Sequence, residues 1–216
     1  MKKITEIYEE YKIMPILQIH QLRVASVALM ICDNLNIKIN KDDVVTACLL
    51  HDIANIIKFR LDYFPEVNEP HGLGYWQSIK DEYIIKYGND EHKASVEITK
   101  NLGLNNNVVH LVDIVDSSFI EEAVKTENFA EKICIYADNR VSPHSIVSIE
   151  ERNLEAKKRY ENHPHGFDEE EREFFMKNMR EVEKQIFSKC KIKPEDINDE
   201  MIQPYLEKLK DFVILD

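Results

Sequence analysis

Hydrophobic residues recur every three or four positions along most of the chain, which is the spacing of helices that bury one face. The clearest case is segment 15–35, where Leu17, Val24 and Ile31 share a face. A short helix before it and further helices over 41–59, 74–87, 90–102, 105–118, 127–140, 146–162 and 168–190 follow from the same spacing. We therefore expect an all-α protein, a compact bundle of many helices.

Residues that favour helix ends stand where this pattern starts or stops. Asn40 is placed to cap the helix that follows it, and Asp168 with Glu171 forms a capping pair. Gly103 is suited to end the 90–102 helix. Pro204 predicts the start of a last helix, because proline is favoured in a first turn.

No segment reads as a linker, so we expect a single domain over residues 1–216. Residues 15–145 are the more apolar part and form the expected core. Residues 146–216 are more charged and predict additional C-terminal helices packed on that core as an appendage.

The charge composition of the chain limits the classes of partner that it is expected to bind. The chain has 216 residues with 28 Lys+Arg and 40 Asp+Glu, a net charge of −12, which disfavours a nucleic-acid polymer or an anionic membrane. Its longest apolar stretch, Val24 to Cys32, is far shorter than the roughly 20 residues that span a bilayer. Because no apolar signal segment opens the chain, we expect a cytoplasmic protein. A homo-oligomer is compatible with the sequence but not required by it.

The candidate chemistry lies on the apolar helices. His20 and His51 each stand on a face that should point inward, and Asp52 follows His51 directly. Asp138 ends a third apolar run, 133–137. A buried carboxylate costs several kcal/mol unless a charge compensates it. Each residue alone has a structural explanation as a core histidine or a helix cap, but together they favour a bound cation.

Two imidazoles and two carboxylates form a mixed nitrogen and oxygen donor set. Such a set suits a divalent transition metal, Mn, Fe, Co, Ni or Zn, better than Ca²⁺. We expect one such metal with open coordination positions. The four cysteines contain no CxxC pair, and Cys32, Cys48 and Cys134 lie in apolar helical patterns, so we interpret them as core residues.

The order His20, His51-Asp52, Asp138 resembles the HD-domain superfamily of metal-dependent phosphohydrolases. The stretches IHQLRVASVALMI, ACLLHDIAN, DEHKASVEITKNLGL and IYADNRVSP carry the resemblance, over roughly residues 15–145. It implies an HD-domain-like helical bundle in which His20, His51, Asp52 and Asp138 bind one catalytic metal.

Two departures from the family pattern matter. The lysine that usually follows the His-Asp pair is Asn55 here, and Lys58 is a candidate replacement. Members with two metals carry further histidines, and His92 matches the first of these positions. Where a histidine pair is expected later, Asp116 stands instead. His92 is open as a metal ligand, a phosphate contact or a surface residue, and Asp116 as a ligand or an exposed carboxylate. A second metal is therefore doubtful.

The resemblance implies hydrolysis of a small phosphate ester, a nucleotide being the favoured class, by attack of a metal-bound water. Asp52 is the candidate to accept a hydrogen bond from that water. Arg23 and Lys58 are candidates to bind phosphate, whereas Arg140 is interpreted as a solvated surface charge. Alternatives are a two-iron oxygenase of the same superfamily and a metal-binding module without turnover.

The loop and helix start around 64–76 hold Phe64, His71, Tyr75 and the single tryptophan, Trp76. These side chains have two interpretations: stacking on a nucleobase, or sealing the core beneath a long loop, which we favour.

Overall fold

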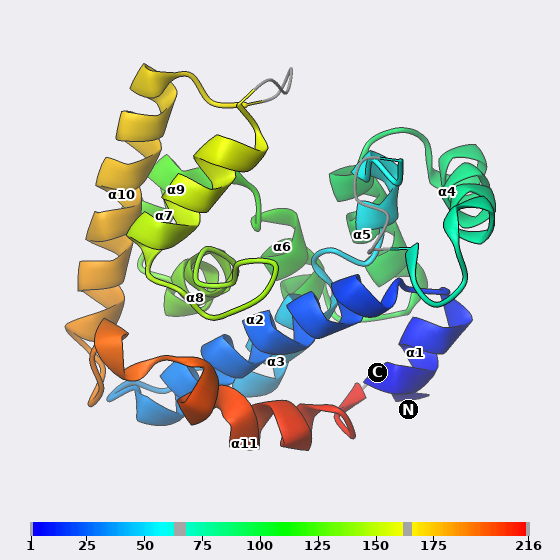
Figure 1. Ribbon diagram of the computed structural model, residues 1–216. Coiled ribbons are helices and arrows are strands. Elements are labelled where there is room, and N and C mark those ends of the chain that lie inside the picture. Colours follow the sequence, from blue (N-terminus) through cyan, green and yellow to red (C-terminus); the bar gives the residue numbers. More distant parts are fainter. Residues whose placement is uncertain (1, 63–67, 162–165, 215–216) are drawn as a thin grey trace.

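The computed structural model describes residues 2–62, 68–161 and 166–214, which fold into a bundle of helices (Figure 1). The α-helices are α1 (Ile4–Glu10), α2 (Pro15–Asn34), α3 (Lys41–Leu50), α4 (Leu73–Tyr87), α5 (Glu91–Asn101), α6 (Asn106–Asp113), α7 (Ile120–Lys125), α8 (Phe129–Asp138), α9 (Ile149–Arg159), α10 (Glu169–Phe187) and α11 (Asp199–Leu209). Short 3₁₀ helices are η1 (Asn55–Lys58), η3 (Ser117–Phe119) and η4 (Pro194–Asp196). The expected all-α class is confirmed.

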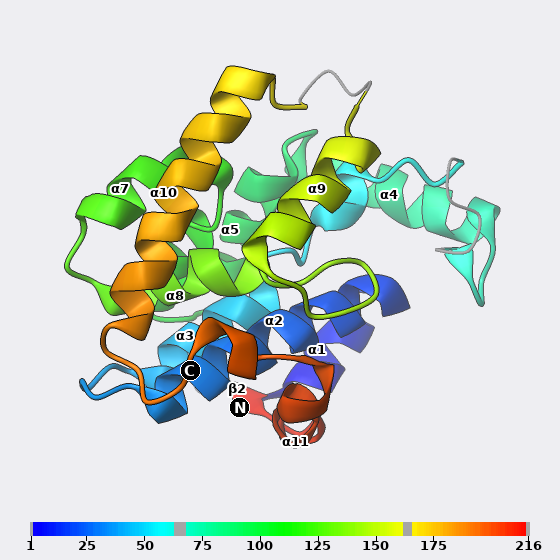
Figure 2. The ribbon, with the colours of Figure 1, turned by 60° about the vertical axis from the view of Figure 1, so that its left-hand side comes forward.

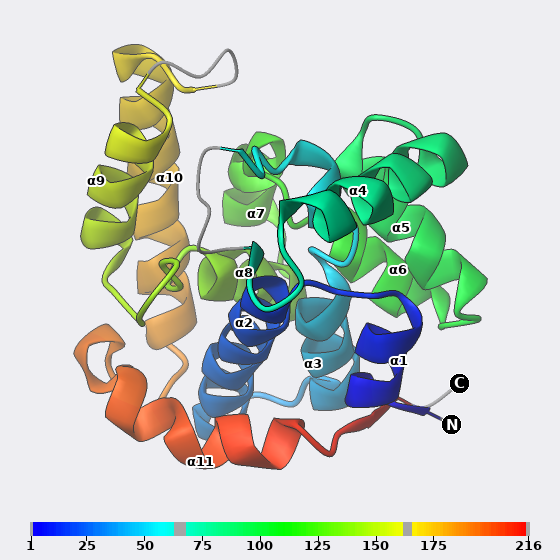
Figure 3. The same cartoon turned by 45° about the vertical axis from the view of Figure 1, so that its right-hand side comes forward.

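Helix α2 is central to the bundle. It packs against α3, α8 and α11, while α3 also packs against α6 and α8 (Figures 1 and 3). Because neighbours surround it, α2 buries side chains on several faces, including every residue from Val24 to Cys32. In the described part of the chain, α2 alone is long and apolar enough to cross a membrane, yet 67% of that window is buried inside the protein. A core helix of this kind passes the same test.

The C-terminal helices wrap around this centre. Helix α10 packs against α7, α8 and α9, and α11 lies along α2 (Figure 1). The strands β1 (Lys2–Lys3) and β2 (Val213–Ile214) pair antiparallel, with Lys2 opposite Ile214. The two ends of the described chain therefore meet.

Most predicted helix ends are confirmed. The Asn40 side chain accepts from the backbone N–H of Asp43 at 3.4 Å. Asp168 and Glu171 form the expected capping box, and Gly103 has a positive φ of 76° at the end of α5. The helix predicted over 41–59 is shorter, since α3 ends at Leu50 and the chain turns before η1.

The placement of Pro204 at a helix start is wrong. Helix α11 begins at Asp199, because the Asn198 side chain caps it by accepting from the N–H of Met201 at 3.1 Å. Pro204 therefore lies inside the helix.

The interpretation of Arg140 as a solvated charge is also wrong. Only 3% of Arg140 is exposed, and its guanidinium donates to the Tyr136 hydroxyl and to the carbonyls of Val147, Pro194 and Ile197. Arg140 thus connects the end of α8 to η4 and the start of the C-terminal part.

The cysteines behave as predicted for core residues. All four are free thiols, and Cys32, Cys48 and Cys134 are buried. A hydrogen bond with Cys134 and burial both raise the pKa of the Cys48 thiol well above its usual range.

Candidate metal centre

His51 stands directly after α3, and its two ring nitrogens have different surroundings. Nδ1 lies 2.9 Å from the backbone carbonyl of Cys48. A carbonyl only accepts, so Nδ1 carries the proton, and in the neutral ring the lone pair belongs to Nε2. That Nε2 atom is buried and has no hydrogen-bond partner among the described residues. The backbone thus presents His51 in the tautomer that a metal ligand requires.

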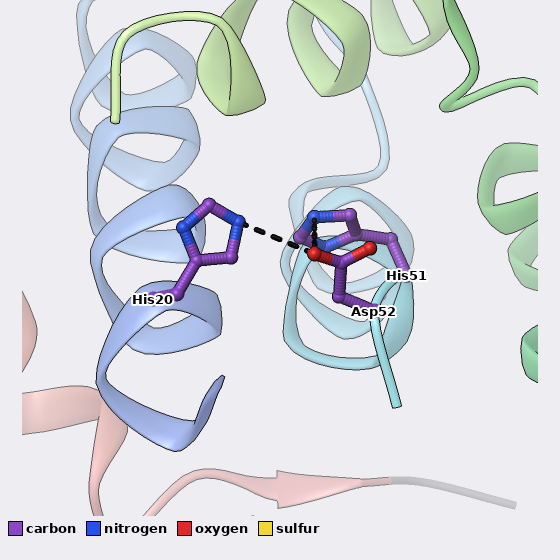
Figure 4. A group of neighbouring side chains, drawn as sticks. All are labelled: His20, His51 and Asp52. Carbon is purple, nitrogen blue, oxygen red and sulfur yellow. Dashed lines mark ion pairs between the residues drawn. The ribbon is translucent and has the colours of Figure 1, made fainter. Parts of the chain in front are cut away.

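The atoms nearest to the His51 Nε2 come from three elements of the fold. Asp138 Oδ1, at the end of α8, lies 3.4 Å away, and Asp52 Oδ2 lies 3.7 Å away. His20 Nε2, from α2, is 3.1 Å from Asp138 Oδ1 and 3.5 Å from Asp52 Oδ2. Figure 4 shows His20 facing His51 and Asp52 across the space between α2 and the end of α3. Helix packing therefore brings together all four residues that the sequence singles out.

Exposure differs across this group. The His51 side chain is 3% exposed, whereas those of His20, Asp52 and Asp138 are 18%, 23% and 27% exposed. His51 therefore forms the closed end of the site, and the two carboxylates and His20 lie toward solvent. A ligand can reach the centre from that side.

The two carboxylates dominate the electrostatics of the centre. Burial alone lowers the pKa of His51, but the negative charges of Asp52 and Asp138 outweigh it and raise that pKa to about 9. Burial raises the pKa of Asp138, yet its interactions with the His20 and His51 imidazoles take it well below its usual value. Without a metal, a proton on His51 thus supplies positive charge beside the carboxylates.

Asn55, at the position where the family usually has a lysine, also contributes to the candidate metal centre. Asn55, at the start of η1, is 6% exposed, and its Nδ2 donates to Asp52 Oδ2 at 2.6 Å. The Asn55 Oδ1 atom is buried without a partner among the described residues. Asn55 therefore orients the Asp52 carboxylate. The sequence interpretation missed this role, although the three-residue spacing in a tight turn is a signal that points to it.

The donor set fits a divalent transition metal. Among the described residues, His20, His51 and Asp52 form a group whose candidate ligand atoms all lie within 4.8 Å of one another. Asp138 joins this group through its short distances to both histidines. A cation here would satisfy the partnerless His51 Nε2 and offset two carboxylates at once, and the mixed nitrogen and oxygen ligands suit Mn, Fe, Co, Ni or Zn.

A comparison with known families identifies this arrangement. Residues 17–190 match the HD domain. The chain belongs to the HD domain family. Among curated proteins and solved structures, no match to the chain is found. The match covers His20, His51-Asp52 and Asp138, and it extends through α9 and α10.

Of the two predicted phosphate-binding residues, Lys58 lies close to Asp52, and Arg23 lies on the same helix as His20. Lys58 Nζ is 3.3 Å from Glu91 Oε1, at the start of α5. Burial lowers the pKa of Lys58, but the charges of Asp52 and Glu91, and more weakly Tyr160, raise it above its ordinary value. Lys58 therefore keeps its positive charge beside Asp52. Arg23, one helical turn after His20, is half-buried and donates to the Pro143 carbonyl at 3.4 Å.

The candidates for a second metal have other partners. His92 Nε2 lies 2.8 Å from the carbonyl of Asp113 at the end of α6. Asp116 caps η3, where its carboxylate accepts from the N–H and hydroxyl of Ser118. Neither belongs to the group of candidate ligand atoms found in the described chain. A second metal site stays a prediction that these contacts do not support.

The aromatic residues near α4 mainly seal the core. Trp76 is 2% exposed, and its Nε1 donates to the Asn68 carbonyl at 3.0 Å. Tyr75 and His71 pack beside it and are exposed. Phe64 lies outside the described residues. The favoured interpretation is therefore confirmed for Trp76.

Proposed function

We propose that this HD domain is a phosphohydrolase that cleaves a small phosphate ester, with nucleotides as the first substrate class to test. A single divalent transition metal would be held by His20, His51, Asp52 and Asp138.

The observation that carries this proposal is the state of His51. Its Nδ1 is bound to the Cys48 carbonyl, while its buried Nε2 points toward two carboxylates without a hydrogen-bond partner in the described chain. Such an atom costs about 1–3 kcal/mol if it stays unsatisfied. A metal ligand role removes that cost and explains why the tautomer is set by the backbone.

The chemistry divides between the bound metal and the chain. When bound, a divalent metal lowers the pKa of water and offsets charge on phosphoryl oxygens. Asp52, partly exposed and held by Asn55, is placed to accept the proton as the water oxygen attacks phosphorus and the ester oxygen leaves. Lys58 and Arg23 supply positive charge for the phosphate.

Net charge supports a small substrate. A chain of net charge −12 repels a nucleic-acid polymer or an anionic membrane, whereas one phosphate group needs only the local charges near Asp52. We also propose that the protein is cytoplasmic. A nucleobase would have to use exposed rings such as Tyr75, because Trp76 is buried.

The test combines metal content with turnover. The purified protein is assayed for bound metal by mass spectrometry and for phosphate release from nucleotides and simple phosphate esters with Mn²⁺, Co²⁺, Ni²⁺ or Mg²⁺. His51→Ala and Asp52→Ala should lose both metal and activity. His110→Ala is the matched control, because His110 is half-exposed and bonds Glu131 instead.

Other results of this test would refute the proposal or favour one of the alternative functions. Activity in metal-free protein would refute the proposal. One metal per chain without turnover on the whole panel would favour a binding module, and two irons per chain would favour oxygen chemistry.

A further inference from the structure

A cavity of about 120 Å³ lies where α9 and α10 meet the end of α8. Its polar lining consists of Arg152 and Arg172 together with Ser117, Asn139 and Asn153. Among the described residues that line it there is no carboxylate, although the whole chain has a net charge of −12. The cavity is therefore locally basic in an acidic protein.

Arg172 is a buried cation that contacts no counter-charge among the described residues. It is 8% exposed, and its Nη atoms donate to neutral acceptors, the Asn153 side chain at 3.0 Å and the Phe167 carbonyl at 3.3 Å. Its Nε has no partner among the described residues. The Glu169 carboxylate accepts a hydrogen bond from Lys157 Nζ at 2.7 Å, which lowers its pKa, and the charge of Arg172 lowers that pKa more weakly. An uncompensated buried charge is costly, so an anion against Arg172 would be stabilising.

Arg152 adds a second donor from the neighbouring helix. One end of its guanidinium pairs with Glu155, yet its buried Nε also has no partner in the described chain. Two arginines, one from α9 and one from α10, thus line the same cavity, and each has one N–H without a partner among the described residues. Charge-assisted bonds from arginine to carboxylate or phosphate oxygens are among the strongest available.

We propose that this cavity is a binding site for a small oxyanion, a carboxylate or a phosphate group. Its oxygens pair with the guanidinium groups of Arg172 and Arg152, and any apolar part packs against Phe175 and Met179. At about 30 Å³ per water molecule, the volume corresponds to about four waters, the size of phosphate or a short branched carboxylate. The lining contains none of the four candidate metal ligands, although Asn139 directly follows Asp138, and the proposal does not rest on the proposed hydrolysis.

The test measures binding of two probes, inorganic phosphate and isobutyrate, by titration calorimetry on the full chain at low salt. Arg172→Gln removes the charge. Ala156→Leu leaves every charge and adds an isopropyl group to a wall of the cavity. We expect either variant to weaken binding at least tenfold. Lys184→Gln, the control, changes a 78% exposed charge on α10 and should stay within twofold of the wild type.

The same titrations after metal removal separate this site from the metal centre. Binding that persists in metal-free protein and is weakened by both variants supports the proposal. Absence of saturable binding by both probes, binding that Ala156→Leu leaves unchanged, or binding that vanishes with the metal would each overturn it. If Arg172→Gln does not fold, Ala156→Leu alone decides.

Discussion

Asn55 offers a direct test of how the metal centre is held together. Its Nδ2 donates to Asp52 Oδ2 at 2.6 Å, and the residue is 6% exposed. Replacement by Leu keeps the number of side-chain heavy atoms and removes the hydrogen bond. Because Asp52 then loses the donor that orients it, we expect metal affinity to fall roughly 10- to 100-fold, the usual cost of deleting a partner of a metal ligand.

The stability of the fold should change much less than the metal affinity. Asn55→Leu loses a hydrogen bond to a charged group, worth about 1.5–3 kcal/mol. It also removes the buried Oδ1 atom, which has no partner in the described chain and costs about 1–3 kcal/mol. These two changes oppose each other, so we expect the free energy of unfolding to stay within about 1 kcal/mol of the wild type.

The assay is competition with a metal chelator, run beside urea unfolding. Asn68→Leu is a matched control: Asn68 is 5% exposed, donates to the Leu61 carbonyl at 2.7 Å, and also has a buried Oδ1 without a partner among the described residues. Asn68→Leu should leave metal affinity unchanged. The reasoning is refuted if Asn55→Leu binds metal as the wild type does, or if both variants weaken binding equally.

Three further predictions concern charge and metal. In metal-free protein the pKa of His51 is about 9, against 6.5 for an ordinary imidazole. Protonated His51 therefore contributes about 3 kcal/mol to the free energy of unfolding, and this contribution is complete below pH 6.5 and is lost as the pH rises through 9. Urea unfolding of wild type and His51→Gln at pH 6 and pH 9.5 measures this, and an equal difference at both pH values would contradict it. Arg140→Leu leaves several buried carbonyls unpaired and should cost at least about 3 kcal/mol in urea unfolding, whereas Arg180→Leu, at a 58% exposed site, should cost little. Metal present at 100 times its Kd stabilises the folded protein by about 2.7 kcal/mol, so chelation should remove this stabilisation and lower the melting temperature. A His51→Ala variant should show no such shift.

Local signals in the sequence predict most of the helices, because each helix depends mainly on residues within its own segment. The three- to four-residue spacing and the caps at Asn40 and Asp168 act within one helix, and both are present in the structure. Pro204 was misplaced because two start signals compete in one segment. The Asn198 cap lies earlier in the chain, and the helix continues past the proline.

The metal centre could be predicted only in part. Residue type and helical pattern indicate His20, His51, Asp52 and Asp138, because an imidazole and a carboxylate on buried helix faces need a compensating charge. The contacts that hold them are not local. The hydrogen bond from Asn55 to Asp52 depends on a turn, and the proximity of Tyr160 to Lys58 depends on how α9 packs against α10 (Figure 2).

The C-terminal helices also support the metal centre through Arg140. Arg140 follows Asp138 by two residues, and its guanidinium binds carbonyls at Val147, Pro194 and Ile197. Because a buried guanidinium has one orientation that satisfies all of these acceptors, it restrains the end of α8. Asp138 is the last residue of that helix. The residues after 145 therefore help to position a candidate ligand that lies before them, so the distance between Asp138 and the two histidines depends on both parts of the chain.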